Sequence, residues 1–101
     1  MQGTINKTYA CSATSGEALF DRSEQALGTR RTAFTIVPLS AGVTVTVALG
    51  DVPAVADAGI VLSANQPYSE SSDGGFECWQ GAVQIVASGA GNVAIRETLE
   101  Y

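Results

Sequence analysis

The side chains that carry most protein chemistry are scarce in this sequence. Its 101 residues include no histidine, which is the usual general base and the commonest metal ligand, and two cysteines, Cys11 and Cys78. Without an imidazole, no serine or cysteine has a plausible base to activate it, and two cysteines alone do not form a zinc site. We therefore expect no enzymatic activity, no metal site and no cofactor.

Two states are open to the cysteines. A disulfide between Cys11 and Cys78 would tie the N-terminal segment to the segment around Trp79, and closing so long a loop would contribute about 4 kcal/mol in the chain-entropy model. Reduced thiols, at least one of them buried, are the alternative, because free cysteine behaves as a small hydrophobic residue. The polar N-terminus carries no secretion signal, so we favour reduced thiols.

Three carboxylates, Glu70, Asp73 and Glu77, surround a glycine-rich stretch at 71–75. Calcium binds such oxygens, but the spacing does not match an EF-hand loop. We favour a solvated hairpin tip, because Asp-Gly-Gly suits a tight turn.

Two further groups are candidates for binding. Tyr68, Phe76 and Trp79 are flat rings that could stack on sugars, although core packing is the default for a tryptophan at the start of a strand. Arg30 and Arg31 precede a strand, and arginine suits bidentate pairing with carboxylates of a partner chain. Equally, these two charges could keep an exposed sheet edge soluble.

The composition narrows the class of partner. The net charge of −5 argues against nucleic acid, and no apolar run is long enough to span a bilayer. Charged residues make up 15% of the chain, against about 25% in typical soluble domains. A chain so poor in charge is expected to hide some of its surface against other chains; the alternative is a monomer solvated by Ser, Thr and Gly.

The elements expected to position these residues are strands. The clearest alternation places Val43, Val45, Val47 and Leu49 on one face of a half-buried strand. The segment 76–97 predicts a β-hairpin that turns at 88–92. Other short strands are expected at 33–37, 60–62 and 68–70, separated by Gly, Pro and Asn.

The N-terminal third is less clear. Residues 1–10 predict an edge strand or an extended arm, and residues 11–29 predict either a short strand at 18–20 followed by a loop, which we favour, or a helix capped at Thr14. We expect one all-β domain, an antiparallel β-sandwich or a jelly-roll-like small barrel. Its core spans residues 30–101, with residues 1–29 as arm or edge strand plus loop.

Several short motifs resemble those of small β-sandwich structural proteins of tailed bacteriophages. The resemblance covers about residues 30–97, and its motifs are Arg30-Arg31 ahead of Phe34-Thr35-Ile36, Gly59-Ile60-Val61-Leu62, Asn65-Gln66-Pro67-Tyr68, and Trp79-Gln80-Gly81-Ala82-Val83 running into Val86-Ala87-Ser88-Gly89. It implies a capsid decoration (cement) protein, assembled in the host cytoplasm and placed on the virion exterior. The implied partners are the major capsid protein and sister subunits in a homotrimer, with no nucleic acid or membrane.

Attachment could involve strand addition by the N-terminal segment, with Ile5, Lys7 and Tyr9 together with Arg30 and Arg31 as partner-binding residues. Two alternatives remain. One is a carbohydrate- or receptor-binding module on the virion surface that uses the three aromatic rings. The other is a head–tail or neck connector, which would form a ring of six or twelve subunits rather than a trimer.

Overall fold

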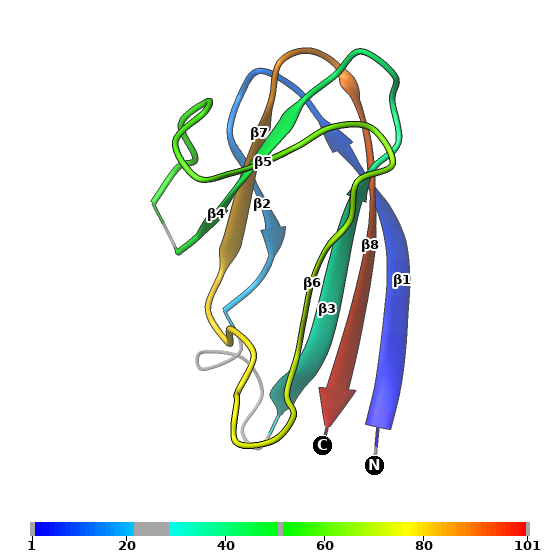
Figure 1. Cartoon of the computed structure of the whole chain (residues 1–101), viewed down its shortest axis with the longest axis vertical. Helices are drawn as coiled ribbons and strands as arrows, with labels where there is room; N and C mark the ends of the chain where they lie inside the picture. The colour runs from blue at the N-terminus through cyan, green and yellow to red at the C-terminus, as the bar shows by residue number, and fades with distance from the viewer. Residues whose placement is uncertain (1, 22–28, 51, 101) are drawn as a thin grey trace.

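The chain folds into two packed four-stranded sheets (Figure 1). The structure, a computed structural model, describes residues 2–21, 29–50 and 52–100. Within these ranges there is no helix, and the strands are β1 (Gln2–Cys11), β2 (Gly16–Leu19), β3 (Arg30–Pro38), β4 (Val45–Leu49), β5 (Ile60–Leu62), β6 (Tyr68–Ser71), β7 (Val83–Ala87) and β8 (Gly91–Glu100). Sheet A has the order β1-β8-β3-β6 and sheet B the order β2-β7-β4-β5.

All strand pairings between these elements are antiparallel, and none joins one sheet to the other. The expected all-β antiparallel sandwich is therefore confirmed, in its open two-sheet form rather than as a closed barrel. The part of the chain that the structure describes contains no helix long and apolar enough to cross a membrane.

The core lies between the sheets and is built by alternation along the strands. Val45 and Val47 of β4 are fully buried, as the sequence predicts. The same pattern is wrong at both Leu49, which is 38% exposed, and Thr46, which is 4% exposed on the opposite face. Thr46 is buried because a loop lies over the outer face of sheet B, where the backbone N–H of Asp57 donates to Thr46 Oγ1 at 3.0 Å.

The predicted hairpin at 76–97 is not a hairpin. Its two strands exist, but β7 pairs with β2 and β4 in sheet B, whereas β8 pairs with β1 and β3 in sheet A. The turn at 88–90 therefore crosses from one sheet to the other (Figure 1). Alternation indicates which side chains face inward, but not which neighbour a strand pairs with.

The glycine-rich tip is a tight turn, as predicted. Asp73 and Phe76 exchange backbone N–H···O bonds of 3.0 and 2.9 Å, and the two residues between them, Gly74 and Gly75, have φ of +56° and +93°. Two successive residues with positive φ are what such a two-residue turn requires.

The N-terminal segment forms an edge strand rather than an extended arm. All ten residues of β1 pair with β8, from Gln2 opposite Glu100 to Cys11 opposite Gly91. The strand β2 then joins sheet B, which supports the strand interpretation of this region; residues 22–28 of the alternative helix lie outside the described residues. Because β1 and β2 contribute to the two sheets, residues 2–19 belong to the same domain as the rest.

Candidate functional site

A β-bulge turns Arg31 into the interior. The pairing of β3 with β8 shifts by one residue between Arg31 and Ala33. In a regular strand Arg31 would share the solvent-facing side of Ala33 and Thr35, but the extra residue, Thr32, reverses the alternation. As a result the Arg31 side chain is fully buried, on the same side as Phe34.

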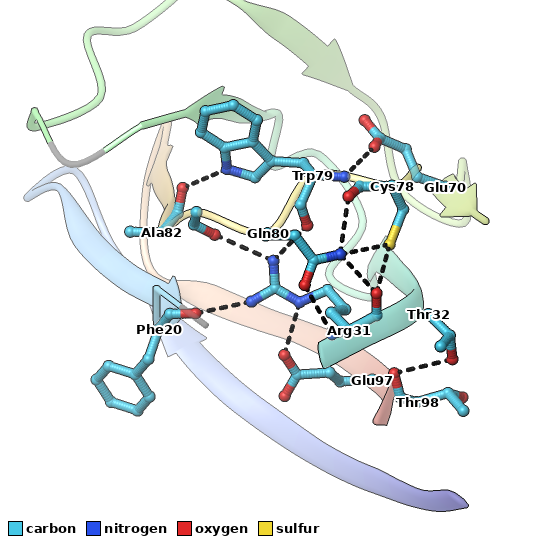
Figure 2. Close-up of polar contacts among 11 residues, drawn as sticks. Phe20, Arg31, Thr32, Glu70, Cys78, Trp79, Gln80, Ala82, Glu97 and Thr98 are labelled. Atoms are coloured by element: carbon cyan, nitrogen blue, oxygen red, sulfur yellow. Dashed lines mark hydrogen bonds and ion pairs between the residues drawn. The ribbon is translucent and has the colours of Figure 1, made fainter. Parts of the chain in front are cut away.

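The guanidinium of Arg31 joins segments from both sheets (Figure 2). Its Nε donates to Oε2 of Glu97 at 2.7 Å. Nη1 donates to the backbone carbonyls of Trp79 (2.7 Å) and Gly81 (3.0 Å), and Nη2 donates to the carbonyl of Phe20 (2.7 Å). One side chain therefore fastens β3, β8, the 79–81 segment and the chain beyond β2 at one end of the sandwich.

The main chain of Arg31 is held equally firmly. Its N–H donates to Gln80 Oε1 at 2.7 Å, and its carbonyl accepts from Gln80 Nε2 at 2.6 Å. The Cys78 thiol donates to the same carbonyl at 3.3 Å. Burial raises the pKa of this thiol, despite the lowering effects of the Ser72 hydrogen bond and the Arg31 charge, so it stays protonated and can donate.

This buried cluster is structural, which corrects the partner-binding role expected for Arg31. Its carboxylate partner is Glu97 of the same chain, both side chains are at most 4% exposed, and no fully buried side-chain N or O among the described residues lacks a hydrogen bond. Arg30 does face solvent, and it lies 3.5 Å from Glu77 in an exposed ion pair. A pair of that kind contributes little to stability.

The positions of the cysteines favour the reduced state. Both are buried and free. Cys11 lies opposite Gly91 at one end of β8, whereas Cys78 contacts Arg31, which lies opposite Leu99. Eight residues of β8 separate those positions by roughly 27 Å, and a disulfide needs its Cα atoms within about 7 Å.

The three candidate stacking rings do not form one platform. Tyr68 packs against Phe34 with ring centroids 6.0 Å apart, and its hydroxyl donates to Glu70. Burial, together with the hydrogen bond and charge of Glu70, raises the pKa of Tyr68 to about 12. Tyr68 is therefore engaged by Phe34 and Glu70 within the domain, and its role in sugar stacking stays a prediction.

The other two rings remain solvent-facing, with Phe76 57% and Trp79 38% exposed. The Trp79 indole N–H donates to the carbonyl of Ala82 at 2.9 Å, and the ring lies over Gly81, where a Cβ would come within 2.6 Å of it. Of the nearby carboxylates, Glu70 accepts the backbone N–H of Trp79 at 2.9 Å. Within residues 2–21, 29–50 and 52–100, no group of three or more acidic or cysteine side chains could hold a metal ion.

A more extensive candidate site is the outer face of sheet A, which sequence reasoning missed. The side chains on this face are small and mostly neutral. They are Thr4, Asn6 and Thr8 of β1, Ala94, Arg96 and Thr98 of β8, Ala33, Thr35 and Val37 of β3, and Ser69 and Ser71 of β6, with the charged Arg30 and Glu100 opposite each other at one end. Cross-strand hydroxyl pairs tie the face together, with Thr35 Oγ1 2.9 Å from Ser69 Oγ and Thr4 Oγ1 3.4 Å from Thr98 Oγ1.

Arg96 stands near the middle of this face with a shallow hollow on each side. One hollow, of about 460 Å³, lies over β1, β8 and β3 and has Val37 and Ala94 among its lining residues. The other, of about 230 Å³, lies over β8, β3 and β6. Arg96 is exposed and forms no hydrogen bond or ion pair with any described residue. Such a guanidinium is free to pair with a carboxylate of a ligand or partner.

The outer face of sheet B differs because the chain itself covers it. Thr46, Gln84 and Val86 point outward there, yet each is less than a tenth exposed. The covering loop is anchored by the Ala54 N–H, which donates to Ser15 Oγ at 2.8 Å. Sheet A is thus the sheet whose outer face is left to solvent.

The predicted partner-binding residues of β1 lie on its inner side, not on this outer face. Tyr9 packs against the core, and its hydroxyl occupies the space where a side chain at residue 16 would be. The Lys7 ammonium lies 5.7 Å from the centre of the Phe20 ring, within cation–π range. Ile5, 43% exposed, lies beside them at the rim of the sandwich.

Comparisons with known proteins add no relative: no family, no curated protein and no solved structure matches this chain.

Proposed function

We propose that this chain is a non-catalytic docking protein that binds another protein through the outer face of sheet A, and that it serves as a capsid decoration protein of a tailed bacteriophage. The observation that carries the docking role is the state of that face, which is uncovered and, between its Arg30 and Glu100 end and β1, carries a single charge, Arg96, that pairs with no described residue. The resemblance of several short motifs to those of phage β-sandwich proteins supports the choice of partner.

Small neutral side chains suit docking for a physical reason. Thr, Ser, Asn and Ala carry little charge to desolvate and few rotamers to immobilise, so burying them against a partner costs little free energy. Thr35, which lies opposite Arg96, and Thr98, two residues along β8, also offer hydroxyl donors beside it. A partner that presents a carboxylate would gain a charge-assisted hydrogen bond from Arg96 and would be oriented by it.

The test is binding to heads assembled without this protein, from the virus whose genome carries the gene. Wild-type chain is expected to co-sediment with the heads at a fixed ratio to the major capsid protein. Arg96→Glu should weaken binding at least about tenfold, because it places a carboxylate against a carboxylate. Arg30→Glu is the charge control, since it makes the same change at the end of sheet A, opposite Glu100 and four residues along β8 from Arg96. The proposal would be refuted if the heads do not bind the wild-type chain, or if they bind Arg96→Glu and Arg30→Glu as well as wild type.

Two exposed rings support a second candidate, a carbohydrate-binding module. Phe76 and Trp79 remain solvent-facing near the 73–76 tip, and exposed aromatic rings stack on sugars. Specific glycan-array binding that is lost in Phe76→Ser and Trp79→Ala, but kept in Arg96→Glu, would favour this module over docking through sheet A.

A further inference from the structure

The outer edge of β1 is an open strand edge of unusual length. The strand has ten residues and pairs with β8 without a bulge, whereas the other edge strands, β2, β5 and β6, have four, three and four residues. Among the described residues, β1 has no backbone hydrogen bonds beyond those to β8. Its other edge therefore presents unpaired N–H and C=O groups, which are a template for another strand.

We infer that this edge pairs with the same edge of a second copy. The two β1 strands would run antiparallel about a two-fold axis at Asn6, joining two copies of sheet A into one continuous sheet. This inference depends on the open edge and not on the proposed function. It also departs from the homotrimer implied by the resemblance, because a self-complementary contact closes with two subunits.

The length and sequence of β1 together favour one register, because only axes at Asn6 or Lys7 pair nine of its ten residues. Residues opposite each other in an antiparallel pair point to the same face, so a two-fold axis must pass at a residue position. An axis at Lys7 would set two ammonium groups opposite each other, which is unfavourable. An axis at Asn6 instead places Lys7 opposite Ile5 and Thr4 opposite Thr8, and it pairs the strand from Gln2 to Ala10.

A second observation, the exposed apolar side chains along this edge, also favours its burial against another copy. Ile5 is 43% exposed and Phe20, just beyond β2, is 50% exposed. The contact between Lys7 and the Phe20 ring shows that the two edges adjoin. In the Asn6 register, the aliphatic stem of Lys7 from one copy would lie over Ile5 of the other, so that pairing would shield apolar surface as well as satisfy backbone groups.

The edge is matched to itself better than to an unrelated strand. Lys7 is the one charged residue in β1, and an inward-pointing lysine on an edge strand ordinarily discourages pairing. In the Asn6 register each Lys7 meets an apolar residue rather than a like charge, so the lysine that disfavours the Lys7 register permits this one.

Two substitutions at one exposed position test the inference. Ile5→Lys would place a lysine opposite Lys7 twice in each dimer, whereas Ile5→Glu would create two opposite-charge pairs. Sedimentation equilibrium over a hundredfold concentration range should show a dimer for wild type and Ile5→Glu. We expect the dissociation constant of Ile5→Lys to rise at least about tenfold. Far-UV circular dichroism and urea midpoints would verify that both variants fold.

Comparing these two variants separates strand pairing from overall charge, because overall charge alone would make Ile5→Glu the weaker dimer. The chain carries −5, so Ile5→Glu increases the mutual repulsion of two copies and Ile5→Lys reduces it. Amide hydrogen exchange should also slow in β1 as concentration rises. A wild-type monomer, trimer or larger ring would overturn the inference, and so would Ile5→Glu dissociating as readily as Ile5→Lys.

Discussion

Loss of the Glu97 charge should remove a large share of this protein's stability. In Glu97→Gln the shape is kept, but the fully buried guanidinium of Arg31 loses the anion that lies 2.7 Å from its Nε. Breaking a buried ion pair costs about 3–5 kcal/mol, because the remaining charge is left in a dry interior. Three backbone carbonyls still accept from Arg31, so we expect the lower end of this range, about 3 kcal/mol.

A loss of about 3 kcal/mol is large relative to the stability of the whole domain. A domain of about 100 residues has a free energy of unfolding of roughly 5–15 kcal/mol. Arg31→Met should be still more damaging, since Glu97 loses its buried cation and three carbonyls lose the hydrogen bonds that Arg31 donates, at about 1–3 kcal/mol for each carbonyl left unsatisfied. That variant is expected not to fold. Combining it with Glu97→Leu should recover part of the loss, because no buried charge then remains at either position.

Equilibrium urea unfolding measures the effect through the fluorescence of Trp79, the one tryptophan in the chain. Its backbone carbonyl accepts directly from Arg31, so the probe reports on this cluster. Glu100→Gln is the matched control, as it makes the same substitution at an exposed position of β8 and should change stability by less than about 0.5 kcal/mol. A Glu97→Gln loss below about 1 kcal/mol would refute the reasoning.

Three further outcomes are expected. The Tyr68 pKa is raised to about 12, so the folded chain keeps a proton that the unfolded chain loses near pH 10, and the free energy of unfolding should fall as pH rises between these values. Tyr68→Phe should lessen this fall. Glu70→Gln should bring the pKa of the Tyr68 phenol, followed by its absorbance, back towards its ordinary range. Gly59→Ala should cost about 1–3 kcal/mol in urea unfolding and more than Gly42→Ala, since both have positive φ but only at residue 59 would a Cβ meet a backbone oxygen at 2.6 Å. Both buried cysteines should resist a thiol reagent in the native protein and react in guanidinium, because burial raises both thiol pKa values; rapid native labelling would contradict their placement.

The strands could be predicted from the sequence because their alternation is a local property. The pattern of β4 correctly predicted Val45 and Val47 as core. The partners of β7 and β8 could not be predicted this way, because pairing is decided by contacts distant in the chain. The exposure of Arg31 was misjudged for another reason: a single inserted residue at the bulge reverses every inward and outward assignment before it.

Two hints to these features were nevertheless present in the sequence. Glu97 occupies an inward position between Ile95 and Leu99, and a carboxylate placed there needs a buried cation nearby. Along the same strand, Arg96 falls on the outward side with Ala94. The pattern of β8 therefore indicated both the buried ion pair and the solvent-facing cation. The hollows beside Arg96, and the fact that no chain segment covers the outer face of sheet A, could not be predicted without the sheet order.

The position of β8 has a consequence for synthesis. This strand fills the gap between β1 and β3, yet it follows every other described strand in the sequence. While the polypeptide emerges from the ribosome, each residue of β1 must wait for a partner that is translated 80 to 98 residues later. Sheet A can therefore close only after β8 has been synthesised. Until then both edges of β1 are open to wrong neighbours, so rapid synthesis through β8 is part of how this fold avoids aggregation.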